Sequence, residues 1–283
     1  MSAAVVVDPI RDAINGGVIG GRLWFYANYH CNLECSYCLT ESGPNVARRM
    51  FDADRMVSIV TEAKSLGFTS IGVTGGEPFM VASMPDTIAR LAAILPVVVL
   101  SNGTLFSGPR MERISTLAKL PVHIQISLDA PDAGANDTKR GDENWSTVVD
   151  AVPRLVGRGL KVRIATTAEE GALSTADHER LCALHRSWGV PDEDHVVRPI
   201  VSRGRAEVDG IGVAVRIEDL PAELCLTVDG AFWSPFGPTV VDGRLDTDLL
   251  ITRTIEPLRT PVAAMIRIAE GSPRGADSTL NIR

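Results

Sequence analysis

The chain alternates short, apolar, β-branched runs with amphipathic stretches, and this alternation constrains its fold more than any other feature. The runs predicted as strands lie at 23–26, 70–74, 97–100, 122–128, 161–167 and 195–201. The stretches with helical periodicity lie at 52–66, 85–95, 111–118, 143–156 and 175–188. Pro153 is expected to kink the fourth of these helices or end it early, because an interior proline removes a backbone hydrogen bond. Six β/α units joined by short loops predict an α/β fold with a parallel sheet.

The alternation ends at residues 202–205, and the remaining chain has a different pattern. Two apolar runs, at 224–228 and 232–233, flank Asp229-Gly230, which is a strong hairpin signal. A last helix is predicted within 256–269. We therefore expect two parts, a domain of residues 1–203 and a small α+β C-terminal cap of residues 204–283.

The composition is that of a globular protein with an excess of acidic groups. Its 283 residues are 45% hydrophobic and 22% charged, which allows a sizeable core. The net charge of −7 argues against general binding to nucleic-acid phosphates. The longest apolar run, 91–100, is far shorter than the ~20 residues of a membrane span, and the run 3–7 stops at Asp8, too early for a signal peptide. We therefore expect a cytoplasmic protein with reduced thiols and no membrane or nucleic-acid partner.

Three of the five cysteines are crowded into one segment directly after the first predicted strand. The spacing Cys31-x-x-x-Cys35-x-x-Cys38 lets three thiolates surround one metal centre. A [4Fe–4S] cluster held by three thiolates would keep one iron open for a ligand. A structural zinc ion, with His30 or a distant residue as fourth ligand, is the alternative. The remaining histidines show no metal-ligand spacing, and Cys182 is expected to be a core residue.

This segment, Cys31-Asn-Leu-Glu-Cys35-Ser-Tyr-Cys38, resembles the signature of the radical S-adenosylmethionine (SAM) superfamily. A second motif, Gly75-Gly76-Glu77-Pro78, ends the second predicted strand and supports the resemblance, which covers residues 20–205. The resemblance implies a partial (β/α)6 TIM-like barrel whose three cysteines hold a [4Fe–4S] cluster that binds SAM. It also implies that residues 75–78 contact the amino group of SAM, with Glu77 as acceptor.

Other positions match the family less specifically. Asn102, Ser127 and Asp129 follow or end predicted strands, and the resemblance assigns them to the ribose and the carboxylate of SAM; ordinary turn residues are the alternative. By the same resemblance, Tyr37 and Ile200 contact the adenine. Arg198 is assigned to SAM or to the substrate, with a buried salt bridge as the alternative.

The C-terminal cap resembles the start of SPASM or twitch extensions, which carry cysteines for auxiliary clusters. Here only Cys225 remains, and the segment past the hairpin reads Ser234-Pro235-Phe236. We expect a cap that closes the barrel mouth without a second cluster. Cys225 is interpreted as a residue of the hairpin core; the alternative is a catalytic hydrogen-atom donor or a substrate contact.

The resemblance implies a reaction as well as a fold. An external reductant of the flavodoxin or ferredoxin type supplies one electron, SAM is cleaved to methionine and a 5′-deoxyadenosyl radical, and the radical abstracts hydrogen from a substrate carbon. We expect a small molecule, such as a nucleoside, a sugar or a secondary-metabolite intermediate, because residues 1–20 are too short for a peptide-recognition module. Peptide modification is the first alternative. An iron–sulfur electron carrier or sensor is the second, and it would not need residues 75–78.

Overall fold

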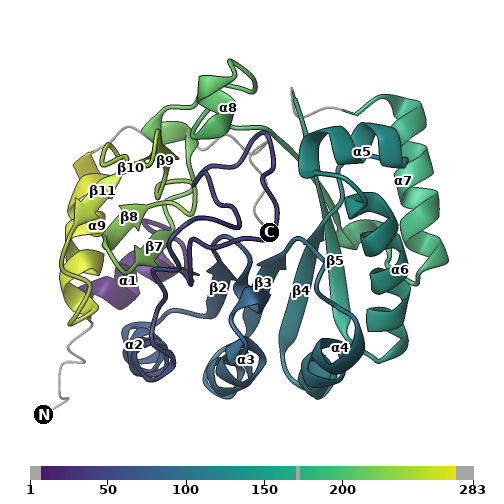
Figure 1. The fold of residues 1–283 in the computed structure, drawn as a ribbon. Helices are drawn as coiled ribbons and strands as arrows, with labels where there is room; N and C mark the ends of the chain where they lie inside the picture. Colours follow the sequence, from purple (N-terminus) through teal and green to yellow (C-terminus); the bar gives the residue numbers. More distant parts are fainter. Residues whose placement is uncertain (1–7, 170–172, 272–283) are drawn as a thin grey trace, which may run out of the picture.

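The computed structural model describes residues 8–169 and 173–271, and its centre is one nine-stranded sheet (Figure 1). The strand order is β11-β8-β7-β1-β2-β3-β4-β5-β6. The first six strands are parallel and adjacent in chain order, as the six predicted β/α units require. They are β1 (Arg22–Tyr26), β2 (Ser70–Thr74), β3 (Val97–Ser101), β4 (Val122–Ser127), β5 (Lys161–Ala168) and β6 (His195–Pro199).

Helices flank this sheet (Figure 1). They are α1 (Pro9–Asn15), α2 (Ala53–Leu66), α3 (Met84–Ala92), α4 (Gly108–Ser115), α5 (Ala133–Arg140), α6 (Asn144–Gly157), α7 (Thr175–Ser187), α8 (Arg205–Val208) and α9 (Arg259–Gly271). Short 3₁₀ segments are η1 (Pro78–Met80), η2 (Thr116–Lys119), η3 (Asp192–Asp194) and η4 (Ile217–Asp219). No helix of the described part is long and apolar enough to cross a bilayer.

Helix α2 shows how the sequence specifies these elements. The Asp52 carboxylate accepts a hydrogen bond from the Arg55 backbone at 3.0 Å and caps the first turn. Gly67, at φ 105°, ends the helix in a left-handed conformation that glycine adopts without strain. The apolar side of α2 packs with the outward side chains of β1 and β2 in one core, as its periodicity predicts.

Two local predictions differ from the structure. Pro153 lies inside α6, which continues to Gly157, because the buried residues Val148, Val152 and Leu155 hold both sides of the proline against the core. The predicted hairpin is present, but its turn is Val228-Asp229, since Thr227 pairs with Gly230.

The C-terminal cap extends the barrel sheet. Its strands are β7 (Leu224–Thr227), β8 (Gly230–Trp233), β9 (Val240–Val241), β10 (Arg244–Leu245) and β11 (Leu250–Thr252). Strand β7 pairs in parallel with β1, and β8 and β11 follow in antiparallel pairing. Within the described residues, no pairing joins β6 back to the other edge, so the barrel is partial. The α/β class is confirmed, whereas the domain boundary near residue 203 stays a prediction.

Candidate functional site

A cavity opens at the carboxyl ends of the barrel strands, where α/β sheets place their ligand sites. Its empty volume is about 1100 Å³, counting the open space at its mouth. The predicted site residues that line it are Cys31, Cys35, Tyr37, Cys38, Gly75, Gly76, Asn102, Ser127, Arg198 and Ile200. The other four, Glu77, Pro78, Asp129 and Cys225, are not among its lining residues. The structure therefore gathers most of the predicted site around one space.

The three cysteines of the first loop reach the cavity from an irregular segment between β1 and α2. The Sγ atom of Cys31 lies 3.6 Å from the Nδ2 atom of Asn102, and that of Cys35 lies 3.9 Å from the backbone oxygen of Arg140. Burial raises the pKa of Cys31 to about 12 and also raises the pKa of Cys35. Both thiols are therefore protonated at neutral pH unless a metal centre displaces the protons.

The donor set of the cysteine segment fits an iron–sulfur cluster. All three cysteines line the same cavity. Thiolates are the usual ligands of iron–sulfur clusters, and three of them leave one iron of a four-iron cluster open. The donor set is therefore suited to a [4Fe–4S] cluster.

The Gly75-Gly76 turn packs directly against the backbone that leads into the first cysteine. A Cβ atom on Gly75 would lie 2.5 Å from the Asn28 oxygen, and one on Gly76 would lie 2.2 Å from the His30 oxygen. The Gly76 amide donates to Asn28 and the Glu77 amide to His30, both at 2.9 Å. Glycine is therefore required at both positions because two backbone segments touch there.

The Glu77 carboxylate faces away from the cavity and joins the ends of β2 and β3. It is fully buried and accepts hydrogen bonds from the Phe79 amide at 3.0 Å, the Asn102 amide at 2.7 Å and the Ser101 hydroxyl at 3.0 Å. Burial raises the pKa of Glu77 to about 7. The predicted contact of this carboxylate with the SAM ammonium stays a prediction, as does that of Pro78, the first residue of η1.

Asn102 links β3 to the cysteine segment. Its Nδ2 atom donates to the Oδ1 atom of Asn32 at 2.9 Å, and its own Oδ1 atom accepts from the Thr104 amide at 3.0 Å. The side chain is 7% exposed and lies beside Cys31. Asn102 thus orients the first cysteine from the neighbouring strand.

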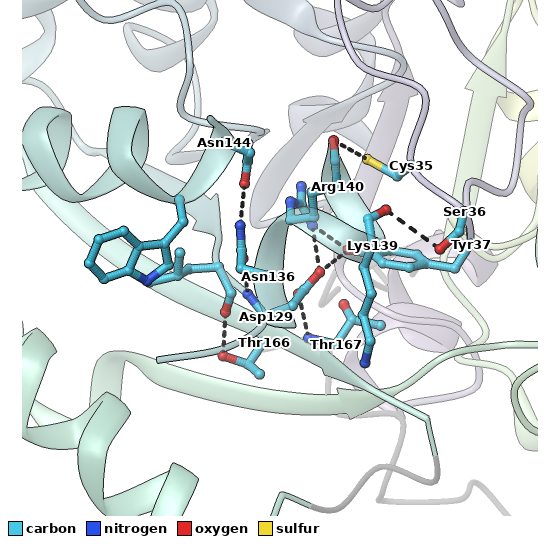
Figure 2. Close-up of polar contacts among 12 residues, drawn as sticks. Cys35, Ser36, Tyr37, Asp129, Asn136, Lys139, Arg140, Asn144, Thr166 and Thr167 are labelled. Atoms are coloured by element: carbon cyan, nitrogen blue, oxygen red, sulfur yellow. Dashed lines mark hydrogen bonds and ion pairs between the residues drawn. The ribbon is translucent and has the colours of Figure 1, made fainter. Parts of the chain in front are cut away.

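Figure 2 shows a buried polar network next to Cys35. The Tyr37 hydroxyl contacts both Asp129 and Arg140, and Arg140 Nη1 lies 3.1 Å from Asp129 Oδ2. The other Asp129 oxygen accepts from the Thr167 amide at 2.9 Å. Asp129 is therefore fully engaged in positioning Tyr37 and Arg140, and its predicted hydrogen bond to the ribose stays a prediction.

The residues directly after β6 hold the cysteine segment from the other side. Gly204 has a φ of 63°, and a Cβ atom there would lie 2.5 Å from the Cys38 oxygen. The Arg205 guanidinium donates to the backbone oxygens of Cys35, Glu41 and Ser42 at 3.0–3.1 Å. One charged side chain therefore fixes three points of the segment that carries the thiols.

Arg198 places a cation in the wall of the cavity that the cysteines line, together with Ser127 and Thr167. The described residues offer Arg198 no hydrogen-bond or ion-pair partner, so the alternative of a buried salt bridge is wrong. Burial lowers the pKa of Arg198, yet Asp129 and Tyr37 act in the opposite direction and favour the charged form. An anionic group in the cavity would complete this site.

The C-terminal cap supplies part of the cavity wall. Pro235 and Phe236 line the cavity together with Leu39. The Val240 amide donates to the Leu39 oxygen at 3.0 Å and fastens the cap to the cysteine segment. This placement agrees with the expected closing role of the cap.

Cys225 lies in the interior below the cavity. It is fully buried in a cluster with Trp24, Tyr26 and Phe232. Trp24 and Tyr26 line the cavity, whereas Cys225 does not. Its placement supports the core interpretation, and the catalytic role stays a prediction that requires a route from the cavity to its sulfur.

The sequence reasoning missed Arg140 and helix α5. The buried residues of α5 are Asn136 and Arg140, so the helix has no apolar periodicity. Its signals are local, with Asp132 accepting from the Ala135 amide at 3.1 Å and Gly141 following the last turn. The polar side chains that remove the hydrophobic periodicity of α5 also contact charged groups of the site, as Arg140 contacts Asp129.

Comparisons with known proteins agree with this geometry. Residues 27–168, half of the chain, match the Radical SAM superfamily. GTP 3′,8-cyclase of Syntrophomonas wolfei is 30% identical over 117 residues, which are 40% of this chain and 36% of that protein. The 7-carboxy-7-deazaguanine synthase of Methanothermobacter thermautotrophicus is 35% identical over 168 residues, which are 56% of this chain and 66% of that protein. The chain thus spans less than two thirds of the length of each.

Solved structures share the fold at low sequence identity. SuiB of Streptococcus suis bound to SAM superposes with a TM-score of 0.56 at 18% identity, over 67% of this chain and 43% of SuiB. The anSMEcpe structure with bound SAM gives a TM-score of 0.55 at 15% identity, over 85% of this chain and 79% of that one.

The partial barrel and its three-thiolate cavity define an iron–sulfur enzyme. The chain belongs to the radical SAM superfamily, and its cofactors are a [4Fe–4S] cluster and SAM. The predictions of an enzyme and of these cofactors are confirmed. The two alternatives, a structural zinc ion at the three cysteines and an electron carrier or sensor, are therefore not retained.

The Arg205 contacts predict a loss of cluster in a variant whose position is far from the cysteines in the sequence. We expect Arg205→Ala to bind well under the wild-type amount of iron after anaerobic reconstitution, because each charge-assisted hydrogen bond contributes about 1.5–3 kcal/mol to the loop conformation. Arg267→Ala, which changes an exposed arginine of α9, is the matched control. Wild-type iron content in Arg205→Ala would contradict the holding role.

The buried Glu77 predicts a pH dependence of stability. Its pKa rises from 4.5 to about 7, so the folded chain keeps a proton that the unfolded chain has released. The contribution of Glu77 to the free energy of unfolding therefore decreases as pH rises from about 4.5 through about 7. We expect the thermal midpoint of Glu77→Gln to decline less than that of the wild type between about pH 5 and pH 8. Glu270→Gln, at an exposed site, should decline like the wild type.

Proposed function

We propose that this enzyme abstracts a hydrogen atom from a small substrate that carries an anionic group. The observation that carries the proposal is the unpartnered Arg198 guanidinium in the same cavity as the three thiols. When bound, the cluster and SAM supply a 5′-deoxyadenosyl radical by one-electron cleavage of the sulfonium. The protein residues provide binding, orientation and exclusion of water.

The wall residues divide the cavity into two regions. We assign Cys31, Cys35 and Cys38 to the cluster, because all three thiols face this space. The Gly75-Gly76 turn lines the same cavity, and we assign its backbone atoms to the amino group of SAM.

The remaining polar and apolar wall is suited to the rest of SAM. We assign Ser127 and Asn102 to its carboxylate and ribose, and Tyr37 and Ile200 to the adenine, since all four line the cavity. The network behind Tyr37 holds its ring in place, because its hydroxyl contacts both Asp129 and Arg140. These residues thus position SAM before any electron transfer.

The substrate region is bounded by Arg198, Thr167 and the cap residue Phe236. A half-buried cation without a partner among the described residues favours a phosphate or carboxylate, since an isolated charge in a cavity is costly. We therefore propose a nucleoside-like, sugar or secondary-metabolite substrate bearing such a group. The names of two curated relatives, GTP 3′,8-cyclase and 7-carboxy-7-deazaguanine synthase, agree with a purine-like compound.

A peptide substrate is the second candidate. PqqA peptide cyclase of Streptomyces rochei is 28% identical over half of this chain, and SuiB has been solved with its precursor peptide. A peptide would have to reach the cavity past Phe236 of the cap. In either case the electron comes from an external flavodoxin or ferredoxin, because the chain contains only one group of closely spaced cysteines.

Iron content and SAM cleavage test the proposed chemistry. We expect about four irons per chain after anaerobic reconstitution, and 5′-deoxyadenosine and methionine when SAM and a reductant are added. Replacement of Cys31, Cys35 and Cys38 by Ala should abolish both signals, whereas Cys182→Ala should keep the iron. About eight irons, or iron that survives the triple replacement, would refute a single cluster at these cysteines.

A variant of Arg198 tests whether this side chain binds the substrate or SAM. If it binds the substrate anion, Arg198→Ala should keep the wild-type dissociation constant for SAM and still produce 5′-deoxyadenosine, but lose the stimulation by an anionic substrate. Loss of a charged hydrogen bond of about 1.5–3 kcal/mol corresponds to at least a tenfold weaker affinity. A weaker SAM affinity of that size would instead assign Arg198 to SAM.

A further inference from the structure

Two histidines and a cysteine meet on the outer face of the sheet, away from the cavity. His178 and Cys182 lie four residues apart on α7, and His195 is the first residue of β6. Ligand atoms of all three lie within 4.8 Å of one another. Helix α7 lies on the side of the molecule opposite β8 and β11 (Figure 1). The sequence analysis did not find this group, because the third residue comes from a different element.

The distances in this group match those around a tetrahedral zinc ion. The Sγ atom of Cys182 lies 3.6 Å from Nε2 of His178 and 3.8 Å from Nδ1 of His195. Bond lengths of about 2.3 Å to sulfur and about 2.05 Å to nitrogen, at a tetrahedral angle, separate the two ligand atoms by about 3.6 Å. An ion could therefore bind with little rearrangement of these side chains.

A hydrogen bond prepares His195 for this role. The Thr166 hydroxyl donates its only hydrogen to the Leu128 oxygen at 2.7 Å. It must therefore accept at its 2.9 Å contact with His195 Nε2, which places the imidazole proton on that nitrogen. The lone pair of Nδ1 then points toward Cys182. Such a second hydrogen bond commonly fixes the tautomer of a metal-binding histidine.

The surroundings give an ion access and leave one coordination position free. His178 is exposed, whereas Cys182 is buried, so the group extends from the core to the surface. One thiolate and two imidazoles are a donor set that suits zinc. His185 packs edge-on against His195 with ring centroids 4.5 Å apart, but it is not a member of the ligand group.

We propose that His178, Cys182 and His195 bind one Zn²⁺ ion, with water in the fourth position. Binding converts the Cys182 thiol to a thiolate and releases its proton to solvent. The site would join α7 to the first residue of β6, the strand that carries Arg198. It is independent of the iron–sulfur centre and does not rest on the proposed reaction.

The test measures zinc and iron together in the full chain. After anaerobic reconstitution, about one equivalent of zinc is added, the excess is removed, and both metals are measured by mass spectrometry. We expect about one zinc in addition to about four irons per chain. His178→Ala, an exposed change that leaves the core intact, and Cys182→Ser should lose at least nine tenths of the zinc and keep the iron. His123→Ala, on β4 outside the group, should keep both metals.

A second variant tests whether the zinc binds instead at the three cysteines of the first loop. Replacement of Cys31, Cys35 and Cys38 by Ala should remove iron and leave about one zinc per chain. In this variant, Co²⁺ should give a thiolate charge-transfer band that disappears on adding Cys182→Ser. Thr166→Val should weaken the affinity for zinc by about 10–100-fold, as measured by competition with a chelator. The proposal fails if the wild type retains no zinc, if His178→Ala retains it, or if the triple replacement removes it.

Discussion

The contact on which the rest of the site depends is the one between the Gly75-Gly76 turn and the backbone of Asn28 and His30. The chain between β1 and α2 has little regular structure, so it cannot hold three thiols in place by itself. At this contact a Cβ atom would lie 2.2–2.5 Å from a backbone oxygen, which fixes where the cysteine segment begins. The two amide hydrogen bonds formed there join the first cysteine to the end of β2. Ordering such a segment costs conformational entropy, and these contacts offset part of that cost.

The other end of the segment is held by chain that lies far away in the sequence. Arg205 binds three backbone oxygens of the segment, and Glu41 accepts from the amides of Asp242 and Gly243 at 2.8–2.9 Å. Arg203 extends the same connection, since its guanidinium lies 2.8 Å from Asp248. The barrel and the cap are therefore coupled through the cysteine segment as well as through the pairing of β7 with β1.

The two faces of the sheet have different chemistry, and this difference separates the two metal sites. Alternation along β5 sends Thr167 to the cavity and Thr166 to the opposite face. The cavity face carries the three thiols and Arg198, to which we assign the proposed cofactor and substrate regions. The outer face is packed by helices, and its polar group beneath α7 is the proposed zinc site. A single strand thus contributes to both without bringing them into contact.

The sequence by itself determined the six β/α units, the three-cysteine motif and the glycine turn, because each depends on a local pattern or on a spacing within one segment. Hydrophobic periodicity found α2 and its boundaries, and it missed α5, whose buried residues are polar. Only the tertiary structure decided the orientations that depend on several segments at once. Burial turned the Glu77 carboxylate toward β3, and the sheet pairing placed Cys225 beneath Trp24 instead of in the cavity. His195 joins His178 and Cys182 for the same reason, since residues separated in the chain become neighbours only when strands pair and helices pack.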